Sequence, residues 1–275
     1  MPAVLFAGLA CLLSAGASAE EQVAVDLELV LAVDVSGSVD GHEARLQREG
    51  YVAALRSPEL VRAIETGIIG RIAVTYVEWA GLGHQFTIID WTVIQDKASA
   101  GRFADALAAA PVNAGPWTSI SGLIDFALPL FERNSVQGTR RVIDISGDGA
   151  NNSGPLVTLA RDAAVKRGVV INGLPIVNDR LQFFGRRQMP DLDLYYADCV
   201  IGGPGAFLVV AEDFNDFARA IRRKLIFEIA GVAPPGSRQA GREPVSGPLH
   251  AAFEGGCDIG ERRLRERGIF PHRDF

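Results

Sequence analysis

Residues 27–38 read Leu-Glu-Leu-Val-Leu-Ala-Val-Asp-Val-Ser-Gly-Ser, an apolar run that ends in an acidic residue and two hydroxyl side chains. A run of this kind is typical of a strand that is buried on both faces of a parallel sheet. Asp34, Ser36 and Ser38 then follow at alternate positions where the strand ends. Their side-chain oxygens suit a hard divalent cation, most simply Mg²⁺ or Mn²⁺.

Strand-like and helix-like segments alternate along the rest of the chain. We expect further strands at residues 71–79, 84–90, 141–146, 169–174 and 206–210, and helices at residues 43–56, 97–110, 119–133, 154–167 and 213–229. The short turn at 81–83 makes the strands on either side of it a hairpin, so one strand is antiparallel to its partner. The alternation predicts an α/β fold: a doubly wound, mostly parallel sheet of about six strands, with one antiparallel edge strand and helices on both faces.

The first 19 residues have the pattern of a signal peptide. Residues 2–13 are almost wholly apolar, and small residues at 17–19 precede Glu20, where cleavage is expected. The apolar run is too short for a membrane span, which needs about 20 residues. No Lys or Arg precedes it, so a misassigned start or a disordered leader stays open, and a lipoprotein reading of Cys11 is weaker because Gly8 stands where Leu is expected. We expect a protein exported to the periplasm or the cell exterior.

Composition divides the mature chain into three parts. Residues 20–230 form the α/β domain, residues 231–256 are rich in Gly, Pro, Ala and Ser and are expected to be a flexible linker, and residues 257–275 are a charged tail with room for a short helix. The sequence predicts no transmembrane segment in the mature chain. The net charge of −6, without a Lys/Arg stripe, argues against nucleic acid as a partner.

Two cysteines remain once the leader is removed, Cys199 and Cys257. An intramolecular disulfide between them is plausible in an oxidising compartment, and two unpaired thiols are the alternative. Neither cysteine has a neighbouring Cys or His at zinc-ligand spacing, and the four His residues are scattered, so zinc is set aside.

Two further oxygen side chains are expected beside the Asp34 cluster. Thr118 opens the helix expected at 119–133, and Asp148 lies just past the strand expected at 141–146. Ligands of open α/β sheets bind beyond the carboxyl ends of the strands, so these residues are placed to converge. The set would hold two carboxylates and three hydroxyls. Each residue also has a plain structural reading, because Asp-x-Ser and Asp-Gly are turn sequences and Thr is a common helix N-cap.

Taken together, these motifs resemble the von Willebrand factor type A (vWA) domain. They are Asp-x-Ser-x-Ser at 34–38, Thr-Ser-Ile-Ser-Gly-Leu-Ile-Asp-Phe-Ala-Leu at 118–128 and Asp-Gly at 148–149, and the resemblance covers about residues 25–229. The stretches 147–152 and 195–207 also resemble the DUF1194 group of bacterial exported proteins, whose function is unknown. One departure is Gly147, where many vWA domains have Thr.

The resemblance implies a metal-ion-dependent adhesion site (MIDAS). Ser36, Ser38 and Thr118 would bind the cation directly or nearly so, while Asp34 and Asp148 would act directly or through water and supply negative charge. One coordination position would remain for an Asp or Glu of a protein partner. Mg²⁺ tends to keep waters that such a carboxylate can displace.

Neighbouring residues leave alternatives open. Asp144 is either a partner of the site residues or simply faces solvent at a strand end, and this second, structural reading is favoured. Asn151 and Asn152 either line the ligand face or form a turn. Trp117 either contacts a ligand or packs the loop.

An exported, metal-dependent protein-binding module of the adhesion type is the function that we expect, and not an enzyme. The alternatives are a metal-dependent hydrolase or phosphotransfer enzyme, or a structural domain with a vacant site. Against catalysis, a second Asp is missing at Ser36, where an aspartyl-phosphate enzyme needs one, and the sequence holds no Gly-x-Ser-x-Gly elbow near a strand end and no phosphate-binding loop.

Overall fold

The computed structural model describes residues 22–177, 181–182, 186–235, 237 and 252–269. In chain order the strands are β1 (Val23–Val25), β2 (Leu27–Asp34), β3 (Ile72–Trp79), β4 (Gln85–Ile94), β5 (Val136–Gly138), β6 (Arg141–Gly147), β7 (Val169–Pro175), β8 (Leu181–Gln182) and β9 (Arg186–Arg187). The helices are α1 (Gly41–Leu55), α2 (Pro58–Glu65), α3 (Lys97–Ala109), α4 (Ile120–Ala127), α5 (Val157–Lys166), α6 (Leu192–Tyr195), α7 (Phe217–Ala230) and α8 (Ile259–Glu266). The expected signal peptide, residues 1–19, lies outside the described residues.

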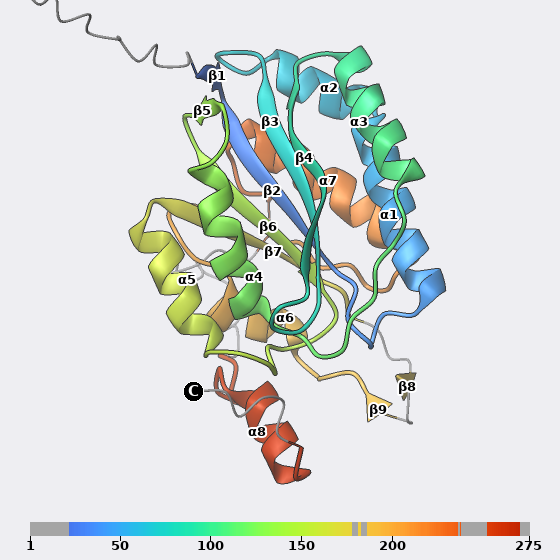
Figure 1. Cartoon of the computed structure of the whole chain (residues 1–275), viewed down its shortest axis with the longest axis vertical. Helices are drawn as coiled ribbons and strands as arrows, with labels where there is room; N and C mark the ends of the chain where they lie inside the picture. The colour runs from blue at the N-terminus through green and yellow to red at the C-terminus, as the bar shows by residue number, and fades with distance from the viewer. Residues whose placement is uncertain (1–21, 178–180, 183–185, 236, 238–251, 270–275) are drawn as a thin grey trace, which may run out of the picture.

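A central sheet with the strand order β4-β3-β2-β6-β7 forms the middle layer of the molecule (Figure 1). Its neighbouring strands are parallel except for the β3–β4 pair, so β4 is the antiparallel edge strand that the hairpin predicts. The predicted α/β fold with a mostly parallel sheet is confirmed. The short β1 and β5 pair with each other beside this sheet.

Helices cover both faces of the sheet, which explains the apolar run in β2. All eight residues of β2 are buried. Leu27, Leu29, Leu31 and Val33 pack in a core with α1, α2, α3 and α7, whereas Val30 and Ala32 pack in a second core with α4 and α5 (Figure 1). A strand between two apolar layers needs apolar side chains at both odd and even positions.

The strand expected at 206–210 is present only as one isolated bridge to β7, between Leu208 and Gly173. Gly173 N donates to Phe207 O, and Val209 N donates to Gly173 O, so the two segments run side by side. Pro175 follows in β7 and has no N–H, so the ladder cannot continue in regular form. The sheet therefore has five strands with this partial sixth at its edge.

The start of α7 differs from the expectation. The helix begins at Phe217 rather than at Asp213, and Asp213 Oδ1 accepts from Asp216 N, 2.7 Å away, in the preceding turn. Asp213 is therefore a turn residue and not the helix N-cap.

None of the helices among the described residues is long and apolar enough to span a bilayer.

Candidate metal centre

Four of the five predicted ligands form one hydrogen-bonded chain at the carboxyl ends of β2 and β6. Ser36 N donates to Asp34 Oδ1 at 2.7 Å, which closes the turn after β2. The hydroxyls of Ser36 and Ser38 lie 3.0 Å apart, and Ser38 Oγ donates to Asp148 Oδ1 at 2.5 Å. Residues that are 110 positions apart thus meet, because β2 and β6 are parallel neighbours and end at the same edge.

Thr118, the fifth predicted ligand, lies in a segment beside these hydrogen-bonded residues. Thr118 N donates to Asn152 Oδ1 at 2.9 Å, and Asn152 N donates to Thr118 O at 2.8 Å. Its Oγ1 lies 3.7 Å from the point where a Cβ on Gly149 would stand, which places it next to the Asp148 loop. The N-cap of α4 is Ser119, whose Oγ accepts from Gly122 N, so the alternative that Thr118 caps the helix is wrong.

Asp34 lies in an environment that a bound cation would stabilise. Its side chain is fully buried, and its Oδ2 makes no hydrogen bond within the described part of the chain. Burial, and then the nearby Asp148 carboxylate, raise the pKa of Asp34 to about 8. A divalent cation would offset both effects, because it favours the ionised carboxylate.

The donor set fits a hard cation, since it offers two carboxylates and three hydroxyls without nitrogen or sulfur. Among the described residues no group of three or more His, Cys, Asp or Glu side chains is placed to hold a metal ion, which a typical zinc site requires.

Tyr196 occupies the space beside Gly147 and explains why this position has no side chain. A Cβ on Gly147 would stand 2.8 Å from the Tyr196 hydroxyl and 2.9 Å from Asp34 Oδ2. The hydroxyl is buried and has no hydrogen-bond partner among the described residues. Tyr196 is a residue of the site that sequence reasoning missed, although the missing side chain at Gly147 was a signal for it.

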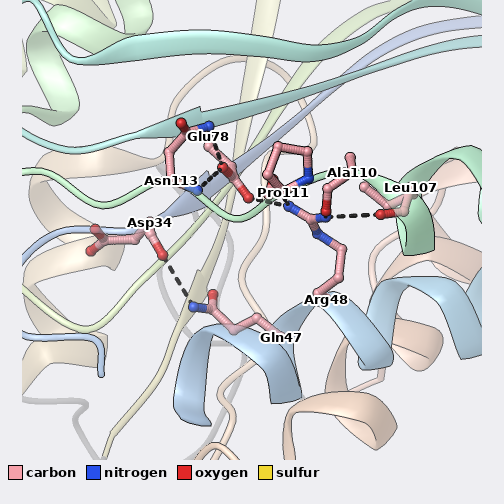
Figure 2. Close-up of polar contacts among 8 residues, drawn as sticks. All are labelled: Asp34, Gln47, Arg48, Glu78, Leu107, Ala110, Pro111 and Asn113. Carbon is pink, nitrogen blue, oxygen red and sulfur yellow. Dashed lines mark hydrogen bonds and ion pairs between the residues drawn. The ribbon is translucent and has the colours of Figure 1, made fainter. Parts of the chain in front are cut away.

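A buried polar network under the site fixes the segment that leads to Thr118 (Figure 2). Gln47 donates to Asp34 O at 3.1 Å, and the neighbouring Arg48 pairs with Glu78. Arg48 also donates to carbonyl oxygens at the C-terminal end of α3 and just after it, those of Leu107, Ala110 and Pro111. Glu78 in turn accepts from the backbone N and the side-chain Nδ2 of Asn113, each at 2.9 Å.

Beside this network a hollow of about 380 Å³ opens between the start of α1 and residues 112–114. Apolar side chains from both walls line it, and the exposed Arg45 lies at its rim. The apolar lining comprises Val35, Val39, Ala44, Val112 and Ala114. Two of its lining residues, Val35 and Val39, flank in sequence the turn that carries Ser36 and Ser38.

Trp117 precedes Thr118 in a left-handed backbone conformation, with φ of 62°. This conformation is costly for a bulky residue and is concentrated at functional sites. A Cβ on Gly81 would stand 2.9 Å from Trp117 Cβ, so the loop packs closely on the β3–β4 turn while the indole stays half-buried.

The favoured expectation that Asp144 faces solvent at a strand end is wrong. Its side chain is fully buried and pairs with Lys224 of α7 at 2.5 Å, so it does not face solvent at the strand end. Asn151 and Asn152 are more than turn formers, because their side chains bond to the segment that carries Thr118 and Ser121.

Cys199 and Cys257 form a disulfide, with their Cα atoms 5.5 Å apart. A disulfide is typical of exported proteins.

The sequence matches the family model described as "Protein of unknown function (DUF1194)" over residues 24–233. No curated protein matches it.

Several solved structures share the fold. The proximal thread matrix protein 1 of the mussel byssus is 13% identical with a TM-score of 0.55, over 76% of this chain and 49% of that chain. The pilus adhesin SpaC from Lactobacillus rhamnosus GG is 12% identical with a TM-score of 0.54, over 75% of this chain and 31% of that chain. A von Willebrand factor type A structure from Catenulispora acidiphila is 13% identical with a TM-score of 0.52, over 74% of this chain and 43% of that chain.

At these identities the likeness shows the fold alone, which is that of a vWA domain. This chain spans about half or less of the length of these solved chains.

Proposed function

The chain belongs to the DUF1194 family, and from the geometry of its site we propose that it is an exported vWA-type module that binds a divalent cation and, through it, an acidic group of a protein partner. Ser36, Ser38 and Thr118 hold the ion directly or nearly so. Asp34 and Asp148 balance its charge, either as ligands or through water. Mg²⁺ or Mn²⁺ is the expected ion.

The observation that carries this proposal is the hydrogen-bonded chain from Asp34 through Ser36 and Ser38 to Asp148. The two carboxylates are joined at one edge of the sheet through the backbone N of Ser36 and the hydroxyls of Ser36 and Ser38. The buried Asp34 Oδ2 is left without a donor in the described part of the chain, and a buried oxygen without a partner is costly. A cation bound there would supply that partner.

The same ion would supply a positive centre for an outside carboxylate. Hydroxyl ligands are uncharged and reduce the positive charge at the cation less than carboxylate ligands would, which strengthens its attraction for an Asp or Glu of a partner. The hollow lined by Val35 and Val39 gives room for the side chain next to that acid, and the exposed Arg45 that also lines it favours an acidic segment.

Two solved structures of the same fold carry related names. A structure of the mussel thread matrix protein is described as having a zinc-occupied MIDAS motif, with 14% identity, a TM-score of 0.52 and coverage of 76% of this chain and 47% of that chain. The pilus protein SpaC is described as an adhesin. These names support a binding role rather than a catalytic one for this chain, and we propose that it is not an enzyme.

Calorimetric titration of Mg²⁺ and Mn²⁺ into the metal-free mature protein tests the site. We expect saturable binding that is lost in Asp34→Ala and kept in Asp105→Ala, which removes an exposed carboxylate elsewhere. Equal affinity in Asp34→Ala and the wild type would show that the site is wrong.

A second experiment tests the partner chemistry. The metal-loaded protein is used to select peptides from a displayed library, and each selected Asp or Glu is then changed to Asn or Gln. We expect binding to need both the acid and the metal, and to be released by EDTA. Peptides that bind equally well in EDTA would contradict a metal-bridged contact.

A further inference from the structure

The C-terminal arm, residues 252–269, packs against the domain although it lies beyond the part that matches the family model. Cys257 is bonded to Cys199, and the ring of Phe253 lies 5.5 Å from that of Tyr195, edge to face. Phe253 N also donates to Asp198 Oδ2 at 2.7 Å, and Leu264 of α8 is buried. In Figure 1, α8 lies below α6, at the end of the sheet that carries the metal centre. The arm is therefore a packed part of this domain.

The arm reaches the loop of the metal centre through Glu261. Asn151 Nδ2 donates to Glu261 Oε1 at 2.7 Å and to Pro155 O at 3.0 Å. On its other side, Asn151 Oδ1 accepts from Ser121 N at 3.0 Å and lies 3.2 Å from Ser121 Oγ. The buried amide is thus fully bonded, and Glu261 supplies one of its partners.

Close packing fixes this contact. A Cβ on Gly260 would stand 2.0 Å from Asn151 O, so only glycine allows α8 to approach the loop so closely. Burial raises the pKa of the Glu261 carboxyl, while the hydrogen bond from Asn151 opposes the rise. The arm and the loop are in direct backbone contact, and a flexible side chain is not their only link.

Asn151 lies in the loop between Asp148, a candidate ligand, and Asn152, which is bonded to the candidate ligand Thr118. Asp148 is three residues before it, and Asn152, directly after it, exchanges hydrogen bonds with Thr118. An Asn151 held by Glu261 therefore fixes the spacing between the Asp148 loop and Thr118.

A second route joins the arm to the base of the site. Tyr195 Oη accepts from Asn151 N at 3.2 Å, and the next residue, Tyr196, places its hydroxyl against Gly147 and Asp34. Cys199, which holds the arm, lies one turn further along the same helical segment. The arm thus contacts Asn151 and Tyr195, and each of them adjoins residues of the proposed site.

We propose that the disulfide-anchored C-terminal arm is a brace for the metal centre, with Glu261 as a positioning residue that acts through Asn151. The brace keeps Thr118 and Asp148 at the spacing that the cation needs. The expected effect on metal affinity rests on the proposed function, whereas the expected effect on the order of the loop at residues 147–153 does not.

The test compares three single variants of the mature protein. Glu261→Ala removes the acceptor for Asn151, Glu261→Gln keeps an oxygen acceptor without the charge, and Glu266→Ala removes an exposed carboxylate from the same helix as the control. Each protein is measured by Mn²⁺ calorimetry and, without metal, by hydrogen exchange of peptides that cover residues 147–153. Circular dichroism establishes that each variant is folded.

Glu261→Ala is expected to lower Mn²⁺ affinity about tenfold, the lower end of the effect of residues that orient metal ligands, and to speed exchange in residues 147–153. Glu261→Gln and Glu266→Ala are expected to match the wild type in both measurements. Rescue by Gln separates positioning from a contribution of charge, and a Gln variant that behaves like Ala would overturn the role given to the hydrogen bond.

Unchanged exchange and unchanged affinity in Glu261→Ala would overturn the brace. If the wild type binds no Mn²⁺, the proposed function fails, and faster exchange in Glu261→Ala alone would still support the brace. If Mn²⁺ binds to the wild type but Glu261→Ala changes neither hydrogen exchange nor Mn²⁺ affinity, the brace is wrong and the metal site is supported.

Discussion

Lys224→Met is expected to destabilise the protein strongly, because it leaves two carboxyl groups buried without their cation. Lys224 Nζ lies 2.5 Å from Asp144 Oδ1 and 3.1 Å from Glu228 Oε2, and all three side chains are fully or almost fully buried. Glu228 Oε1 also accepts from Asn172 Nδ2 at 2.8 Å. Removing one partner of a buried ion pair typically costs about 3–5 kcal/mol. For a domain of this size the cost corresponds to a fall in Tm of about 6–20 °C.

The size of the loss should depend on pH. Burial, and then the Glu228 carboxylate, raise the pKa of Asp144 well above its usual range, and Lys224 opposes the rise. Because the pKa is higher in the folded state than in the unfolded state, stability is full below the ordinary Asp range and is lost as pH rises through the folded-state pKa. Without Lys224 that loss is larger. The difference in the free energy of unfolding between the variant and the wild type should therefore be greater at about pH 8 than at about pH 5.

Urea denaturation followed by tryptophan fluorescence measures the free energy of unfolding at both pH values. Lys166→Met is the matched control, since Lys166 is exposed on α5. Two outcomes would refute the reasoning: a loss below about 1 kcal/mol, which is the middle of the range for ordinary substitutions, or a loss that is the same at both pH values.

Three further predictions follow from other contacts. Arg48→Met should cost about 3–5 kcal/mol in the same denaturation assay, because the buried Glu78 loses the cation that it pairs with; a change below about 1 kcal/mol would contradict this. Gly147→Ala puts a Cβ 2.8 Å from the Tyr196 hydroxyl, and should weaken Mn²⁺ binding at least about tenfold, with partial recovery when Tyr196→Phe is added; an unchanged Kd in calorimetry would show that the space is not needed. Alkylation without reductant should leave the mass of the mature protein unchanged, because Cys257 is bonded; a mass gain of two alkyl groups would rule the bond out.

The sequence predicted the central sheet well because burial on two faces leaves a strong pattern. The apolar run of β2 and the turn between β3 and β4 depend on local residues, and both were found. The helix α2 was missed, although Ser57 before Pro58 is a common helix start and Ser57 Oγ accepts from Leu60 N. The strand expected at 206–210 was wrong as a regular strand, because Pro175 interrupts the ladder on its neighbour and no pattern within 206–210 records this.

The candidate ligands could be predicted for a different reason. Asp34 and Asp148 both follow apolar strands, and parallel neighbours bring the residues after them to one edge. The residues around them could not be found in this way. Tyr196 reads as an ordinary core aromatic, and Glu261 lies 110 positions from the Asn151 that it contacts. Their roles depend on the packing of the arm and of the segment after α6, which has no short-range signature.

The bond between Cys199 and Cys257 also decides what happens to a chain that is cut. The two cysteines are 58 positions apart, and the chain between them includes α7 and the stretch expected to be a linker. Hydrolysis of any peptide bond in that interval would leave two fragments that are still covalently joined. A single cut between the two cysteines could therefore not release α8. Its release would also require reduction of the disulfide.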